Sequence, residues 1–319
     1  MKKLSGQKTA RFARKGLINL QAAAIDIGTN SSRLLIGELN CQENGINILE
    51  RELQITRLGE GVDANKKLTK NAVNRVIKAI REYKNIMDKY DLKSIRVVGT
   101  SALRDVHNSE ILTKEIKEIG FELQIISGEK EAQLNFLGAA SSLKDQFLLL
   151  DIGGGSTEFI WPADKEINYK SLDIGCVRMT ERFINNPEAE VSEEEIKNIE
   201  EFTLDLLSKE LDLPQNLRLK GVGGTITTLA AVKHRMAVYD SSKIEGSKLN
   251  VFELNDFLTD FKDMNLVERS QVKGLQAERA DIITAGLVIL ISILNFCACN
   301  NLTVSDKDLL YGLLKEQLF

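Results

Sequence analysis

The chain has 319 residues, enough for one large domain or two ordinary ones, and 43% of them are hydrophobic, enough to form real cores. Its formal net charge of −4 argues against a general nucleic-acid binder, because such proteins are usually basic. The 4 cysteines and 2 histidines fit neither a zinc framework nor a disulfide scaffold, so we expect a reduced, cytoplasmic protein.

Neither a secretory signal nor a membrane span is predicted from the composition of the chain. Residues 1–20 are basic and contain no acidic residue, and no apolar segment of the signal-peptide type follows them. We interpret residues 1–20 as a disordered tail, with a weak contact to a polyanion as the alternative. Residues 282–299 are nearly all apolar, but they only reach the lower limit of spanning length and polar residues interrupt them, so we expect a buried helix.

Short apolar runs separated by glycine turns organise the first part of the chain. Residues 22–26 and 32–39 are typical of two strands joined by a tight turn at Gly28. Apolar residues at helical spacing predict a helix over 70–90, and Gly120 is placed to end another helix that begins near Ser109. The other elements expected here are strands at 46–51, 95–99 and 124–126 and a helix at 129–140.

The pattern of strand, glycine turn and strand begins again at residue 147. Strands are expected at 147–151 and 157–161, on either side of a turn formed by three glycines. Ser192 and Glu195 have the spacing of a capping box and open a long helix. Further along we expect a strand at 219–223 that leads into a helix, then the long apolar helix, a strand at 302–304 and a final helix from about residue 306.

The two halves of the chain repeat one motif. Asp26-Ile-Gly-Thr-Asn-Ser31 and Asp151-Ile-Gly-Gly-Gly-Ser156 share Asp-Ile-Gly and end in Ser, and each closes one strand and opens a hairpin. This internal duplication predicts two related α/β domains that face each other across a cleft. We place the first domain at 21–134 and the second at 135–319, with the final helix as a candidate to pack back on the first domain.

Each glycine turn is a candidate phosphate-binding loop. A Gly-rich turn after a strand lets backbone N–H groups approach phosphate oxygens closely. In Rossmann and P-loop sites the chain continues directly into a helix, whereas here both turns lead into strands, which disfavours dinucleotide binding and a Walker-type ATPase. The candidate phosphate-binding residues are Gly28, Asn30 and Ser31 in the first turn and Gly153, Gly154, Gly155 and Ser156 in the second.

Two carboxylates flank the second turn. Asp151 stands at the end of a strand, and Glu158 follows Ser156 by two positions. Magnesium prefers oxygen ligands and is usually held by one or two carboxylates together with water and substrate oxygens. We therefore expect Asp151 and Glu158 to hold Mg²⁺, with Mn²⁺ as a substitute. The alternative is that Asp151 caps the turn and Glu158 points to solvent.

Several ordered motifs extend from about Ala23 to the C-terminus. They are Ala24-Ile-Asp-Ile-Gly-Thr-Asn-Ser-Ser-Arg33, Val98-Gly-Thr-Ser-Ala-Leu-Arg104, Ile126-Ser-Gly-Glu-Lys-Glu-Ala132, Leu150-Asp-Ile-Gly-Gly-Gly-Ser-Thr-Glu158, Gly175-Cys-Val-Arg-Met179, Gly221-Val-Gly-Gly-Thr-Ile-Thr-Thr-Leu229 and Arg279-Ala-Asp281. Together they resemble the exopolyphosphatase and guanosine pentaphosphate phosphohydrolase family in its short two-domain form. The resemblance implies the actin-like, sugar-kinase-like ATPase fold, with two ribonuclease-H-like domains whose mixed β-sheets are flanked by helices.

The resemblance also implies an activity and roles for individual residues. The enzyme would release the terminal phosphate of inorganic polyphosphate or of guanosine pentaphosphate, the latter linking it to the stringent response. Glu131 would be the base that activates water, Asp151 and Glu158 would hold Mg²⁺, and Asp26 would lie beside the metal. By position alone, Glu131 could instead complement the dipole of its helix. Residues implied to contact phosphate or substrate also include Arg33, Arg104, Ser156, Gly223, Gly224, Thr225 and Arg279. These phosphate compounds are the expected partners, without nucleic acid or membrane, and a homodimer is compatible with the resemblance.

The chain departs from the family pattern at a few positions, and two other functions stay open. Asp308, Leu310 and Tyr311 replace the Gly, Arg and Glu of a C-terminal motif, and Glu245 stands where a His is common. These changes concern substrate identity more than hydrolysis. One alternative is a small-molecule kinase of the same fold, in which the turn at 223–225 contacts a nucleoside. The other is a non-catalytic sensor of guanosine tetra- or pentaphosphate.

Overall fold

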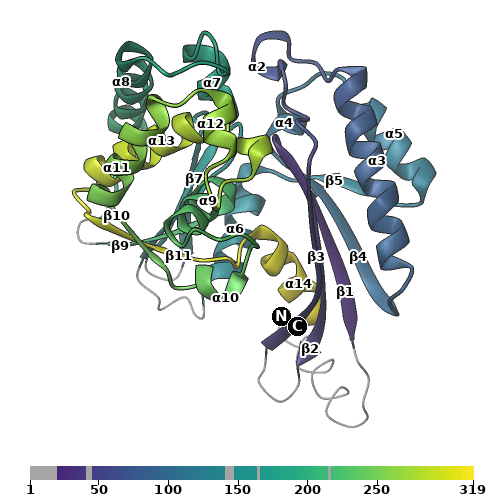
Figure 1. The fold of residues 1–319 in the computed structure, drawn as a ribbon. Helices are drawn as coiled ribbons and strands as arrows, with labels where there is room; N and C mark the ends of the chain where they lie inside the picture. Colours follow the sequence, from purple (N-terminus) through teal and green to yellow (C-terminus); the bar gives the residue numbers. More distant parts are fainter. Residues whose placement is uncertain (1–19, 41–44, 141–146, 164–165, 215–216) are drawn as a thin grey trace. The chain divides into compact units, whose positions relative to one another are not determined.

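The computed structural model describes residues 20–40, 45–140, 147–163, 166–214 and 217–319 (Figure 1). Apart from Leu20, the tail predicted at 1–20 lies outside these residues. The chain divides into two compact units, one made of Met1–Gly138 with Leu309–Phe319 and the other of Ala139–Asp308. The last helix of the chain therefore belongs to the first unit.

The first unit is built on a five-stranded mixed sheet. Its strands are β1 (Gln21–Ile27), β2 (Ser31–Asn40), β3 (Gly45–Ile55), β4 (Leu92–Gly99) and β5 (Leu123–Ile125). They lie in the order β3-β2-β1-β4-β5, where β2 is antiparallel to both β1 and β3, and β4 and β5 run parallel to β1. All the strands predicted for this half are present, and β3 is longer than predicted.

Helices cover both faces of this sheet. They are α2 (Val62–Asn65), α3 (Lys70–Met87), α4 (Ser101–Arg104), α5 (Ser109–Ile119), α6 (Gly128–Ala139) and α14 (Leu309–Leu318). Successive side chains of a strand point to opposite faces. Accordingly, Ala23 and Ile25 of β1 join the core beneath α3 and α5, whereas Ala22 and Ala24 join the core beneath α14. Figure 1 shows α3 and α5 on one side of the sheet and α14 on the other.

The second unit repeats this topology. Its strands are β6 (Phe147–Ile152), β7 (Thr157–Ala163), β8 (Glu166–Leu172), β9 (Arg218–Val222), β10 (Lys248–Asn250) and β11 (Asn301–Val304). The sheet order is β10-β11-β9-β6-β7-β8, so β8-β7-β6-β9-β11 corresponds to β3-β2-β1-β4-β5 in both order and direction. The duplicated Asp-Ile-Gly motif thus marks equivalent positions in two related sheets.

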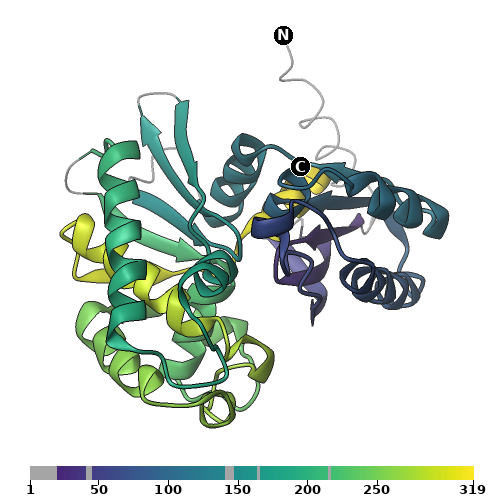
Figure 2. The same cartoon turned by 90° about the horizontal axis from the view of Figure 1, so that it is seen from above.

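The core of the second unit is centred on α13. The helices of this unit are α7 (Cys176–Phe183), α8 (Glu193–Glu210), α9 (Gly223–Lys233), α10 (Ser241–Ile244), α11 (Val251–Lys262), α12 (Leu266–Ser270), the 3₁₀ helix η1 (Ala277–Arg279) and α13 (Ile283–Phe296). Every residue of α13 from Ile283 to Leu294 is buried, and α13 packs against α8 (Figure 2), so the predicted buried helix is confirmed. The predicted capping box of Ser192 and Glu195 opens α8. None of the described helices has the length and hydropathy needed to cross a bilayer.

Helix α14 begins at Leu309, later than the predicted start near residue 306. The carboxylate of Glu245 accepts hydrogen bonds from the Ser305 hydroxyl at 3.0 Å and from the Asp306 backbone N–H at 2.9 Å. The Asp306 carboxylate in turn accepts from two hydroxyl groups of the segment 239–241. These contacts fix residues 305 and 306 within the second unit, and the helix starts only after them.

Candidate active site

The turn between β1 and β2 has its carbonyl groups bound inside the first unit. The Gly28 N–H donates to the Ser31 carbonyl at 2.9 Å and closes the turn. The carbonyls of Thr29 and Asn30 accept from backbone N–H groups of the segment 56–59 at 2.8–3.0 Å. In a trans peptide the N–H points opposite to the carbonyl. The N–H groups that follow these carbonyls therefore point away from that segment.

The turn between β6 and β7 has the same design. The Gly153 N–H donates to the Ser156 carbonyl at 3.0 Å. The carbonyls of Gly153 and Gly154 accept from backbone N–H groups of residues 176–178, at the start of α7, at 2.9–3.1 Å. Arg178 Nε donates to the Gly155 carbonyl at 2.7 Å. With its carbonyls held by α7, this turn directs the N–H groups of the following residues away from α7.

Neither turn uses its inner N–H groups for hydrogen bonds within the described residues. In the first turn this holds for the N–H groups of Thr29 and Asn30, and in the second for those of Gly154, Gly155 and Ser156. Within the same ranges the side-chain nitrogen of Asn30 also lacks a partner, although Asn30 is 8% exposed. Buried N–H groups are rarely left unsatisfied in folded proteins. Both turns are therefore suited to bind an anion.

Gly175 allows α7 to approach the second turn so closely. It is the N-cap of α7, and a Cβ atom there would lie 2.4 Å from the carbonyl carbon and oxygen of Gly154. Any larger residue would push α7 and the turn apart. The sequence motif contains Gly175, but it gave no role for this residue, because the contact arises only from the tertiary packing.

Asp151 and Glu158 lie directly opposite each other on β6 and β7. Glu158 is 1% exposed, so the alternative that it points to solvent is wrong. Its Oε1 accepts hydrogen bonds from Ser156 Oγ at 2.7 Å and from Ser171 Oγ at 2.8 Å. Ser171, on the neighbouring strand β8, was not predicted from the sequence. Because like charges at facing positions of a sheet repel, this pair is suited to share a cation.

The donor chemistry at this pair fits a magnesium ion. Within the described residues, no cluster of three or more His, Cys, Asp or Glu side chains is close enough to hold a metal by itself. Magnesium commonly takes only one or two carboxylates and completes its shell with water and substrate oxygens. Asp151 and Glu158 would supply the protein ligands. Asp26, the third predicted ligand, belongs to the first unit, and its place beside the metal stays a prediction.

The turn between β9 and α9 packs against Asp151 and Arg279. Gly223 has φ +87°, and a Cβ there would lie 2.1 Å from Asp151 Oδ1. A Cβ on Gly224 would lie 2.0 Å from Arg279 Nη1. Arg279 is 7% exposed, and its Nε donates to the Gln276 side chain at 2.8 Å. The second unit thus brings the Asp151–Glu158 pair, the glycine turn at 223–224 and the buried Arg279 into one site.

Thr225 is placed differently from the two glycines before it. It is 3% exposed and sits where a Cβ on Gly286 of α13 would lie 2.6 Å from its methyl group. The side chain is therefore packed between α9 and α13. Its predicted contact with substrate stays a prediction.

In the first unit, both predicted arginines form ion pairs with predicted acidic residues. Arg33 Nη2 lies 2.7 Å from Asp26 Oδ2, across the β1–β2 pairing. Arg104 Nη1 lies 2.6 Å from Glu131 Oε2, and it also donates to the Ile126 carbonyl. Glu131 is 7% exposed and stands in the first turn of α6. Arg104 uses only Nη1 within the described residues, so its Nε and Nη2 can bind a phosphate oxygen.

The site residues are divided between the two units. Asp26, Arg33, Arg104 and Glu131 belong to the first unit, and the Asp151–Glu158 pair belongs to the second. Each unit therefore carries a glycine turn of the Asp-Ile-Gly motif with acidic and basic side chains beside it. The cleft between the units stays a prediction from the sequence.

Sequence comparison identifies relatives over almost the whole chain. The model of the Ppx/GppA phosphatase family matches residues 39–318. A bifunctional 3-dehydroquinate synthase/phosphatase of Fusobacterium nucleatum is 40% identical over 311 residues, which cover 93% of this chain and 46% of that protein. Exopolyphosphatase 2 of Mycobacterium tuberculosis is 31% identical over 311 residues, which cover 92% of this chain and 97% of that protein. The chain thus spans about half of the first relative and nearly all of the second.

Structural comparison agrees with the sequence. The crystal structure of the Aquifex aeolicus member of the Ppx/GppA protein family superposes with a TM-score of 0.78 at 31% identity, covering 94% of this chain and 98% of that one. The predicted fold class, two related domains with mixed sheets flanked by helices, is confirmed. The chain belongs to the Ppx/GppA phosphatase family.

Proposed function

We propose that the chain is a phosphohydrolase that releases the terminal phosphate of inorganic polyphosphate or of guanosine pentaphosphate. The observation that carries this proposal is the common design of the turns at 28–31 and 153–156, whose carbonyls are bound internally while their inner N–H groups are not. Such concave arrays of N–H groups bind phosphate. Membership of the Ppx/GppA phosphatase family and the similarity to exopolyphosphatase 2 support this substrate class.

In this proposal Glu131 removes a proton from the attacking water. Its carboxylate is buried, and Arg104 fixes its position through the 2.6 Å ion pair. Arg104 then has two functions, since its other nitrogens can bind a substrate phosphate while Nη1 holds the base. Phosphoryl transfer depends mainly on alignment and charge stabilisation, so an arginine that contacts both the base and the substrate phosphate suits the reaction.

The second unit binds and neutralises the phosphates. The N–H groups of the turn at 153–156 and the guanidinium of Arg279 contact phosphate oxygens. Asp151 and Glu158 hold Mg²⁺, with Mn²⁺ as a substitute, and the hydroxyls of Ser156 and Ser171 orient Glu158. When bound, the metal stabilises negative charge that develops on the phosphoryl oxygens.

A phosphate-release assay tests this function directly. Long-chain polyphosphate, guanosine pentaphosphate and ATP are each incubated with the protein and Mg²⁺, without an added acceptor. We expect inorganic phosphate from polyphosphate, from guanosine pentaphosphate or from both. A kinase of the same fold would need an acceptor, and a sensor would bind guanosine tetra- or pentaphosphate without turnover. No release from any of the three compounds would contradict the proposal.

A further inference from the structure

We propose that α14 positions the base Glu131, by fixing the helix α6 on which it stands. This inference rests on the proposed function, because it assigns Glu131 a role in the reaction. Helix α14 contacts α6 near its beginning, at its middle and at its end, and the same helix is bound to the central strands of the first sheet. Both helices belong to the first unit.

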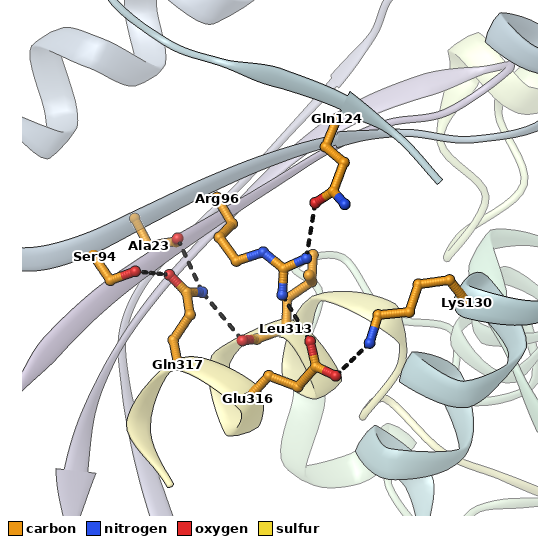
Figure 3. Close-up of polar contacts among 8 residues, drawn as sticks. All are labelled: Ala23, Ser94, Arg96, Gln124, Lys130, Leu313, Glu316 and Gln317. Carbon is orange, nitrogen blue, oxygen red and sulfur yellow. Dashed lines mark hydrogen bonds and ion pairs between the residues drawn. The ribbon is translucent and has the colours of Figure 1, made fainter. Parts of the chain in front are cut away.

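The contact near the beginning of α6 is an ion-pair network centred on Glu316 (Figure 3). One carboxylate oxygen of Glu316 pairs with Lys130 Nζ on α6. The other pairs with Arg96 Nη1 on β4 at 2.7 Å. Lys130 directly precedes Glu131 in the chain, so the Lys130–Glu316 pair ties the residue next to the base to α14.

The contact at the middle of α6 is a close approach of backbones. A Cβ on Gly312 of α14 would lie 2.0 Å from the Leu134 carbonyl oxygen and 2.7 Å from its carbonyl carbon. Leu134 lies three residues after Glu131, about one helical turn along α6. Only glycine permits this distance between the two helices, so a larger residue at position 312 must move α6 or α14.

The contact at the end of α6 involves carbonyl groups of its last turn. Lys315 Nζ of α14 donates to the carbonyl of Leu137 at 2.7 Å and to that of Gly138 at 3.3 Å. The last carbonyls of a helix lack partners within the helix, and a cation there also complements the helix dipole. With this contact, α14 meets α6 at three separate places, near its beginning, at its middle and at its end.

Helix α14 is itself fixed on the sheet. Gln317 donates to the Ala23 carbonyl of β1 at 3.3 Å and accepts from Ser94 Oγ of β4 at 2.7 Å (Figure 3). Leu310 is 5% exposed in the core beneath α14, and Tyr311 packs against that core. The departures from the family motif at these two positions therefore strengthen the apolar attachment of α14.

The ion pair offers the mildest test, because its partners can be changed without altering the backbone. We would measure kcat and KM for phosphate release from polyphosphate with Glu316→Gln, Lys130→Gln and the double variant. Partly exposed ion pairs contribute little to stability, so the variants should stay folded and their melting temperature near neutral pH should fall only slightly. A displaced base lowers the rate without changing binding, so we expect kcat to fall ~3–10-fold with KM within about twofold. Since the two residues act through one contact, the double variant should match the single variants.

Arg96→Gln is the matched control, since it removes the other partner of Glu316 and leaves the pair with Lys130. Its kcat should stay within about twofold of wild type. If Gly312→Ala still folds, it should lower kcat more strongly, by ~100-fold. If it does not fold, the ion-pair variants alone test whether α14 positions Glu131. Wild-type kcat for both Glu316→Gln and Lys130→Gln, or additive losses in the double variant, would overturn the inference. A failure of the proposed function gives different results from a failure of this inference. If the proposed function is wrong, the wild type releases no phosphate, or Glu131→Gln retains the full rate.

Discussion

At the scale of single residues, the role of Glu131 can be separated from a structural one. Glu131→Gln keeps the size of the side chain and can still accept a hydrogen bond from Arg104, but it cannot take up a proton from water. A general base contributes typically ~10²–10⁴-fold to the rate, so we expect kcat to fall at least ~100-fold with substrate binding retained. Glu129 stands in the same turn of α6, but its carboxylate accepts a hydrogen bond from Gln133, whereas that of Glu131 accepts one from Arg104, so Glu129→Gln is the control. A wild-type kcat for Glu131→Gln would refute the assignment.

The carboxylate pair of the second unit makes a second prediction at this scale. Asp151→Asn removes one of two facing negative charges on β6 and β7. If these carboxylates hold the metal, activity should require Mg²⁺ or Mn²⁺, and the variant should need a higher metal concentration for half-maximal activity while remaining folded. Asp205→Asn, which removes only an exposed pair with Lys209 on α8, should leave the metal dependence unchanged. Full activity of the wild type in excess chelator would contradict the metal site.

Gly175 provides a third prediction, which tests whether the contact with α7 supports the turn at 153–156, the proposed phosphate-binding turn. The Cβ of Gly175→Ala would lie 2.4 Å from the Gly154 carbonyl, and overpacking of this kind costs typically ~1–3 kcal/mol. The turn would shift, so we expect the KM for polyphosphate to rise at least ~10-fold. Gly45→Ala is the control, since no atom of the described residues lies within 4 Å of a Cβ there. An unchanged KM for Gly175→Ala would show that the turn does not depend on α7 for its shape.

At the scale of secondary-structure elements, the attachment of α14 should depend on pH. Burial opposes the charged form of Glu316, but hydrogen bonds from Lys130 and Arg96 outweigh it and hold its pKa below the ordinary value. A depressed pKa stabilises the folded state above the unfolded-state pKa, and this contribution is lost as the pH falls through the folded-state pKa. The melting temperature of wild type should therefore exceed that of Glu316→Gln near neutral pH, and the difference should disappear in acid. A difference that persists below the folded-state pKa would contradict this origin.

Prediction of the elements from sequence succeeded where the apolar pattern is strong, either as a periodic spacing or as a continuous run. Helix α3 was predicted because apolar residues recur at helix spacing, and the hairpin strands and α13 were predicted because they are continuous apolar runs. Helices α11 and α12 were missed, although Asn250 with Glu253 and Asn265 with Glu268 form capping boxes that the sequence displays. Strand β8 and helix α7 were also not predicted, because the apolar pattern of their sequences is weaker.

The same distinction applies to the site. The glycine turns and their carboxylates were predictable because each is a contiguous motif. The residues that hold these motifs in place were not predictable. Ser171 reaches Glu158 only through the β7–β8 register, and Gly175 reaches Gly154 only through tertiary packing. Sequence motifs identify the residues that meet a ligand, whereas the residues behind them are selected by contacts between distant segments.

At the scale of the whole molecule, the chain leaves the first unit after Gly138 and returns to it at Leu309. The first unit therefore cannot complete its core until the end of the chain is available. The leucines of α14 in that core are 0–5% exposed, and they are Leu309, Leu310, Leu313, Leu314 and Leu318. Burial of a leucine side chain contributes roughly 1.5–3 kcal/mol, so together they contribute on the order of 8–15 kcal/mol as an upper estimate. That is comparable to the whole stability of a typical domain, about 5–15 kcal/mol.

This comparison predicts that removal of α14 unfolds the first unit and spares the second. In a chain truncated after Asp308, limited proteolysis should degrade the first unit and leave a resistant fragment close to Ala139–Asp308, whose core contains no residue of α14. A synthetic peptide of residues 309–319, added in excess, should restore protection, because binding to the folded state stabilises it by mass action. The same peptide with Leu313→Asp, which places a charge in that core, is the control and should not protect. If the truncated chain resists proteolysis as well as the full chain does, the first unit does not depend on α14.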